Sequence, residues 1–96
     1  MRKKNETTLG DAIKAYLKAM GLDRKLRENQ LINSWEDTLG KAVANSTERM
    51  YIDNKVLFVQ LNSSIIRQEL LMMKTALVAR LNQNVGEQVI TDIVLR

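Results

Sequence analysis

Residues 31–43, LINSWEDTLGKAV, form the stretch around which the rest of the chain is organised. On a helical wheel its apolar side chains fall in one arc around the single tryptophan of the chain, Trp35. A ring of this size on an apolar stripe is far more often buried than exposed. We therefore expect Trp35, with Leu39 and Val43 on the same stripe, to anchor a small core. Gly40 lies inside this predicted helix, where we expect it to permit close approach of another backbone.

The composition limits the possible functions. A chain of 96 residues forms one domain with a modest core. It contains neither Cys nor His, which removes disulfides, thiolate ligands, the usual general base and the commonest metal ligand. The sequence has no long apolar run and no signal peptide, so we expect a cytoplasmic protein without membrane contact. No nucleotide-binding or nucleophile motif is present, so we expect no enzyme, no cofactor and no metal.

Basic charge is concentrated at the N-terminal end. Residues 1–27 hold eight basic and three acidic residues, whereas residues 28–96 hold seven basic and eight acidic ones. Such asymmetry favours a polyanionic partner, the alternative being a solvated tail and a solvated helix face. If the partner is nucleic acid, phosphate contacts would come from Arg2, Lys3, Lys4, Lys14, Lys18, Arg24, Lys25 and Arg27. Binding through phosphates would tolerate any base sequence.

The N-terminal third predicts an arm and two helices. Residues 1–7 are polar and basic and predict a flexible arm, followed by a single domain over residues 8–96. Thr8 and Asp11 resemble a capping box at the start of a helix that ends at Met20. A main helix is predicted over residues 28–45. The charged segment 23–27 is either a separate turn or an early start of that helix.

Beyond residue 45 the pattern changes from the helical period to alternation. Asp53-Asn54 can form a tight hairpin, because both residues tolerate left-handed conformations. The elements expected here are a strand over residues 49–53, a buried strand over 56–61, a helix over 64–84 and a strand over 88–95. The order helix–helix–strand–strand–helix–strand predicts an α+β domain whose three-stranded sheet is covered by helices on one face.

The predicted helix over residues 64–84 has a broad apolar arc. Its central stripe, which we expect to be buried, consists of Ile66, Leu70, Met73, Leu77 and Leu81. Ile65 and Met72 lie beside this stripe. Apolar side chains outside the buried stripe make a candidate surface for a protein partner.

An ordered set of mostly apolar positions runs through the chain. It comprises Trp35-x3-Leu39-Gly40-x2-Val43-Ala44, Thr47, Leu57-x-Val59, Glu69-Leu70, Leu81-Asn82 and Ile93-x-Leu95-Arg96. This set resembles the DciA family of bacterial proteins over residues 22–96. The resemblance implies a KH-like domain that binds DNA and assists loading or recruitment of the replicative helicase DnaB.

Two hypotheses follow. The first is a non-catalytic, DciA-like nucleic-acid-binding accessory protein of DNA replication. An ordinary KH domain holds a nucleic-acid backbone with a G-x-x-G loop, but no two of the four glycines here are three residues apart. Binding would therefore rest on Lys and Arg. The second hypothesis is a protein-interaction module that binds no nucleic acid.

Overall fold

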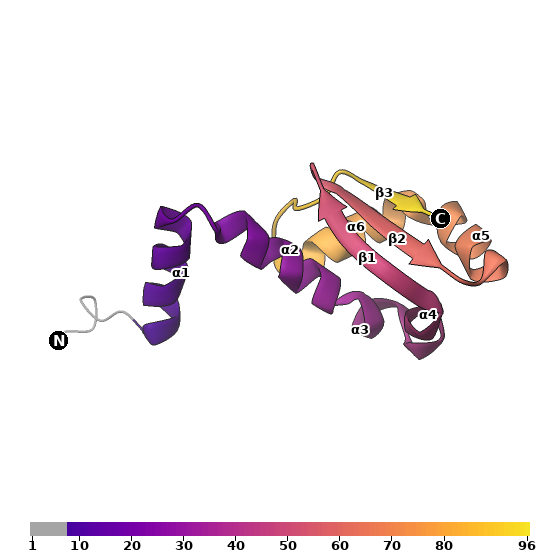
Figure 1. The fold of residues 1–96 in the computed structure, drawn as a ribbon, viewed down its shortest axis with the longest axis horizontal. Coiled ribbons are helices and arrows are strands. Elements are labelled where there is room, and N and C mark those ends of the chain that lie inside the picture. Colours follow the sequence, from indigo (N-terminus) through magenta and orange to yellow (C-terminus); the bar gives the residue numbers. More distant parts are fainter. Residues whose placement is uncertain (1–7) are drawn as a thin grey trace.

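The structure is a computed structural model and describes residues 8–96 (Figure 1). Its elements are α1 (Leu9–Ala19), α2 (Asp23–Asn33), α3 (Trp35–Leu39), α4 (Lys41–Ser46), β1 (Thr47–Asp53), β2 (Val56–Leu61), α5 (Ser64–Met72), α6 (Lys74–Val85) and β3 (Asp92–Leu95). The strands lie in the order β1-β2-β3, with β1 antiparallel and β3 parallel to β2. The predicted α+β class with one three-stranded sheet is confirmed. The arm predicted over residues 1–7 lies outside the described residues.

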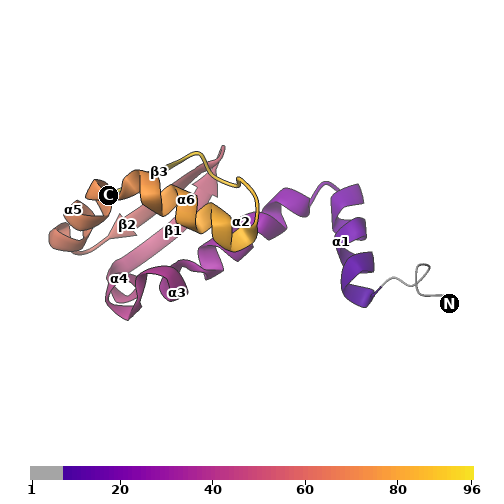
Figure 2. The same ribbon diagram turned by 180° about the vertical axis from the view of Figure 1, so that it is seen from behind.

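Helices cover one face of the sheet. Helix α6 lies behind the strands in Figure 1 and in front of them in Figure 2. The buried core lies between this helical layer and the sheet and consists of Leu31, Trp35, Leu57, Val59, Leu61, Leu70, Leu77, Leu81, Val89, Ile90 and Ile93. Alternate side chains of the central strand β2 enter this core, as its alternating pattern requires. Within residues 8–96, no helix covers the opposite face, which we call the open face.

Helix α1 does not join the layer that covers the sheet. The helix begins where the sequence predicted, because the Thr8 hydroxyl caps it by accepting a hydrogen bond of 3.0 Å from the Asp11 N–H. The helix nevertheless projects away from the sheet (Figures 1 and 2), and none of its residues is buried. Its apolar stripe remains 49–78% exposed at Leu9, Ile13, Tyr16 and Met20. The layer that covers the sheet is therefore formed by the later helices, without α1.

Three helices, α2, α3 and α4, occupy the segment for which one helix over residues 28–45 was predicted. The helical segment begins earlier than predicted, at Asp23, and is interrupted at Ser34 and again at Gly40. Gly40 has φ 92° and ψ 171°, a backbone conformation that other residues rarely adopt. A Cβ atom at this position would meet no atom within 4 Å. Gly40 therefore serves a turn between helices, and our expectation of a helix-interior glycine under a close backbone was wrong.

The predicted helix over residues 64–84 is also interrupted. Met73 leaves the helical conformation, with φ −119° and ψ 26°, so α5 ends before it and α6 begins after it. As a result Met73 is 43% exposed, and its predicted place on the buried stripe is wrong. Leu70, Leu77 and Leu81 on the same stripe are buried.

The last strand, β3, begins later than predicted, because the side chain of Asn82 forms hydrogen bonds with the backbone that precedes the strand. The Asn82 side-chain oxygen accepts hydrogen bonds from the N–H groups of Val89 (2.9 Å) and Ile90 (3.0 Å). Its amide nitrogen donates to the Ile90 carbonyl at 2.9 Å. Val89 and Ile90 are thus buried with their backbone paired to Asn82 rather than to β2. Regular pairing starts at Asp92.

The hairpin and the strand pairing fix which side chains face each way. The two loop residues, Asn54 and Lys55, both have positive φ, as a two-residue hairpin turn of the favoured type requires. The turn is thus one residue later than predicted. At the other end of β1, Thr47 pairs with Leu61 but Arg49 pairs with Gln60, so Glu48 is an extra residue in the strand.

Trp35 connects the helices to the sheet. Its side chain is 3% exposed, and its indole Nε1 donates a 3.0 Å hydrogen bond to the Thr47 hydroxyl. That hydroxyl in turn donates to the Val43 carbonyl at 2.8 Å. Leu39 and Val43 pack against the core beside the ring. One side chain therefore joins α3, α4 and the first residue of β1.

Replacing Trp35 should damage the fold strongly. Trp35→Ala is expected to lower the free energy of unfolding by about 3–5 kcal/mol, because it leaves a large cavity in the core. Urea melts followed by circular dichroism would measure this loss. Trp35→Phe keeps much of the ring and should lose clearly less. A loss below about 1 kcal/mol for Trp35→Ala would show that the core does not depend on the indole.

Candidate nucleic-acid interface

Four exposed basic side chains lie on the two sides of the turn between α1 and α2. Lys14 and Lys18 come from α1, and Arg24 and Lys25 come from the first turn of α2; we call these four residues the basic elbow. The turn contains Gly21 at φ 76°. Within residues 8–96, the structure records no ion pair of these four side chains. Cations in the first turn of a helix oppose the helix dipole, so helix stability does not explain Arg24 and Lys25.

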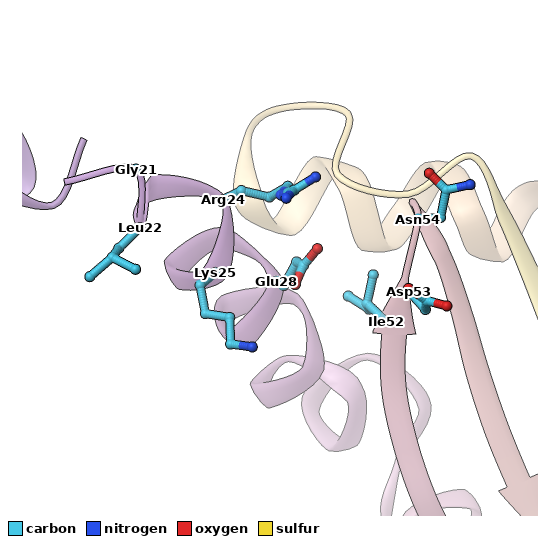
Figure 3. A pocket seen from close by; sticks show the side chains of 8 residues that line it. All are labelled: Gly21, Leu22, Arg24, Lys25, Glu28, Ile52, Asp53 and Asn54. Carbon is cyan, nitrogen blue, oxygen red and sulfur yellow. The ribbon is translucent and has the colours of Figure 1, made fainter. Parts of the chain in front are cut away.

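A hollow of about 470 Å³ separates the start of α2 from the hairpin end of β1 (Figure 3). Arg24 and Lys25 border it and point in different directions, as Figure 3 shows. The carboxylates of Glu28 and Asp53 line the same hollow. Two cations and two carboxylates leave the hollow nearly neutral. A phosphate would therefore be better placed along the outer side of the elbow than inside this hollow.

Arg27, predicted as a phosphate contact, already has two partners. Its Nε lies 3.3 Å from an oxygen of Asp23 and 3.0 Å from an oxygen of Glu87. The side chain is half-buried and connects α2 to the segment that follows α6. Its charge is thus neutralised by carboxylates of the same fold. Arg2, Lys3 and Lys4 lie outside the described residues.

The fold adds a basic residue that the charge count missed. Lys55, in the hairpin loop, borders a hollow of about 200 Å³ together with Arg24 and Arg27. Asp23 and Glu87 also line this hollow. Lys55 lies outside the N-terminal segment in which the basic residues are concentrated. Only the tertiary structure places it beside α2.

The open face carries a group of side chains that the sequence reasoning also missed. The rings of Tyr51 and Phe58 are stacked, with centroids 4.9 Å apart and planes at 10°. The guanidinium carbon of Arg49 lies 5.1 Å from the Tyr51 centroid, and that of Arg96 lies 5.3 Å from the Phe58 centroid. We call these four residues the open-face stack. The alternation of apolar and polar residues in both strands was the available signal, because it assigns these side chains to the face away from the core.

The candidate protein-partner residues are at the opposite end of the molecule from α1. Ile65 is 71% and Met72 is 75% exposed. They are seven residues apart on α5, so they lie on one side of that helix. In Figure 1, α5 and α1 lie at opposite ends of the long axis. The structure thus presents two separate exposed apolar surfaces, one on α5 and one on α1.

One acidic side chain has a perturbed ionisation. Asp92 accepts a 2.8 Å hydrogen bond from the Ile93 N–H, and its carboxylate lies 3.3 Å from the Lys74 ammonium. The N–H first, and then the ammonium, hold the pKa of Asp92 below its ordinary value. The carboxylate therefore stays charged at neutral pH and connects the start of α6 to the start of β3. Among residues 8–96, no acidic cluster suited to a metal ion is found.

These features define a small α+β protein with exposed basic and exposed apolar surfaces. The family description that matches the chain is Dna[CI] antecedent, DciA, and the match covers residues 8–95. The chain therefore belongs to the DciA family. No curated protein and no solved structure matches it. In the part of the chain that the structure describes, no helix has the length and apolar character needed to cross a membrane.

The contacts of Arg27 and of the basic elbow predict different effects on stability. Arg27→Ala should lower the free energy of unfolding by up to about 1 kcal/mol, because it removes two partly exposed ion pairs. The double substitution Arg24→Ala/Lys25→Ala should change it by less than about 0.5 kcal/mol, since both side chains are exposed. Thermal melts of the two variants would compare them. Equal effects would contradict the distinction between a structural arginine and an exposed basic surface.

Proposed function

We propose that this chain is a non-catalytic accessory protein of bacterial DNA replication, which binds nucleic acid and assists the replicative helicase DnaB. The observation that carries the proposal is the family match over residues 8–95. We also assign the fold as KH-like, which the order of elements from α2 to β3 supports once the interrupted helices are joined. A factor that works on the replicative helicase acts in the cytoplasm.

The basic elbow supports the nucleic-acid part of the proposal. Four cations from two helices flank one turn, and a flexible strand can contact several of them at once. The spacing of the four glycines leaves out a G-x-x-G loop. Affinity would then come from phosphate contacts, which makes binding tolerant of base sequence and sensitive to salt. The arm residues Arg2, Lys3 and Lys4 would add further contacts of the same kind.

Salt-dependent binding tests this proposal. Fluorescence anisotropy with labelled single-stranded DNA should give a log–log salt slope of about −3 or steeper, because the four cations of the basic elbow contribute about −0.7 each and the arm residues add to this. Arg24→Glu/Lys25→Glu should weaken binding at least about tenfold and flatten the slope by about 1.4 or more, because it removes two phosphate contacts and adds repulsion.

The matched control reverses the same number of charges elsewhere. Lys41→Glu/Arg80→Glu changes two exposed residues of α4 and α6 and should weaken binding much less. No binding by the unmodified protein at low salt would refute nucleic-acid binding. Equal losses in the two double variants would show that net charge, and not the basic elbow, determines affinity.

A second candidate function is protein interaction, and the exposed face of α1 favours it. An 11-residue helix with a capped start presents Leu9, Ile13, Tyr16 and Met20 to solvent. Large exposed apolar patches usually mark sites of contact with another molecule. Within the proposed role, we assign this face to the helicase. The patch of Ile65 and Met72 on α5 is the alternative contact.

Substitutions on opposite sides of α1 test the helicase contact. Ile13→Glu/Tyr16→Glu should abolish co-elution of the protein with purified replicative helicase, because it places two charges in the apolar stripe. Ala15→Glu, on the far side of the helix, should leave co-elution unchanged. If Met72→Glu abolishes co-elution and Ile13→Glu/Tyr16→Glu does not, the contact belongs to α5 instead.

A further inference from the structure

The open face concentrates the aromatic residues that the core does not use. The chain has four aromatic residues, of which Trp35 belongs to the core. Tyr51 and Phe58 lie directly opposite each other in β1 and β2, and neither belongs to the core cluster. Tyr51 is 38% exposed. Half of the chain's aromatic residues therefore meet on a face that no described helix covers.

One arginine side chain lies near each of the two rings. Arg49 lies over the Tyr51 ring and Arg96 over the Phe58 ring. The backbone of Arg96 is held beside β2, because its N–H donates to the Val59 carbonyl at 2.9 Å and its carbonyl accepts from the Leu61 N–H at 2.8 Å. Each ring therefore has one guanidinium group about 5 Å from its centroid, and the four side chains come from three adjacent segments of the sheet.

This combination matches the chemistry of unpaired bases. Bases of single strands stack on aromatic rings and on guanidinium planes, and arginine can at the same time bind phosphate. The hollow among these side chains is only about 40 Å³, so a base would lie on the surface rather than inside a pocket. Gln60 borders the same hollow and brings an amide that can pair with the edge of a base.

The two ends of the open face carry opposite charges. Arg49 and Arg96 lie toward one end of the sheet. Asp53 pairs with the first residue of β2, Val56, at the hairpin end. Its carboxylate repels phosphate, whereas the guanidinium groups attract it. A strand on this face would therefore place its phosphates at the arginine end and its bases over the rings.

We propose that the open-face stack of Arg49, Tyr51, Phe58 and Arg96 is a stacking site for the bases of single-stranded nucleic acid, separate from the basic elbow. The proposal rests on the proposed function in that the ligand is nucleic acid. It goes further in naming the strand form and the contact. Bases in a duplex already stack on one another, so the open-face stack distinguishes single strands from duplexes, whereas the basic elbow contacts both through phosphates.

Binding of labelled DNA by the full chain tests the proposal. Tyr51→Leu and Phe58→Leu keep an apolar side chain but remove the ring, and each should weaken binding to a 20-nucleotide single strand about tenfold. Binding to a duplex of the same length should change by less than about twofold, since no base is free to stack. Leu71→Ala, which truncates a 42% exposed apolar side chain of α5, is the control and should leave both affinities unchanged. A 2-aminopurine base in the single strand should be quenched by the unmodified protein and much less by Tyr51→Leu.

Arg49→Gln provides a variant that alters no buried group. It should weaken single-strand binding severalfold and flatten the salt slope by about 0.7. Thermal melts of all variants separate loss of the site from loss of the fold. If a ring variant fails to fold, the Arg49→Gln result and the quenching by the unmodified protein decide the question.

The outcomes separate this proposal from the proposed function. Unchanged single-strand affinity in Tyr51→Leu, Phe58→Leu and Arg49→Gln overturns the stacking site, while weakened binding in Arg24→Glu/Lys25→Glu still supports the proposed function. Equal losses for single strand and duplex also overturn it. Self-association that Tyr51→Leu abolishes without loss of DNA binding would assign the open face to a second copy of the chain. Absence of any DNA binding by the unmodified protein refutes both.

Discussion

Burial of the Trp35 ring is the interaction on which the rest of the fold depends, and the Thr47 hydroxyl accepts a hydrogen bond from its indole N–H. In one continuous helix, Val43 would lie about 12 Å further along the axis than Trp35. The turn at Gly40 redirects α4, so that the Val43 carbonyl, the Thr47 hydroxyl and the indole meet. A buried ring with a satisfied N–H then joins the helical layer to the first strand.

The sequence predicted element types well because burial repeats with the period of each element. The alternation of Leu57, Val59 and Leu61 correctly predicted the buried face of the central strand. The interruptions at Ser34 and Met73 could not be predicted, since the chain has no proline and the apolar spacing continues across both positions. The late start of β3 depends on Asn82, whose side chain replaces strand pairing.

For the candidate sites too, the sequence predicted only what depends on residues close together in the chain. Counting charges along the chain identified the basic elbow, because Lys14, Lys18, Arg24 and Lys25 are close together in sequence. It could not identify the partner of Arg27, Glu87, which is distant in sequence. The open-face stack likewise joins residues of β1 and β2 with Arg96, and only the sheet brings them together. Interactions between segments distant in sequence therefore had to come from the structure.

The extra residue Glu48 in β1 has a consequence for how this stretch can change in evolution. Because Glu48 is inserted, Thr47 turns toward Trp35 while Arg49 and Tyr51 stay on the open face. Deletion of one residue here would move either Thr47 or both Arg49 and Tyr51 to the opposite face of the sheet, since neighbouring side chains of a strand point in opposite directions. The length of this segment is thus constrained more tightly than its composition. Homologues should vary freely in the residue that occupies the bulge but should rarely tolerate an insertion or deletion there.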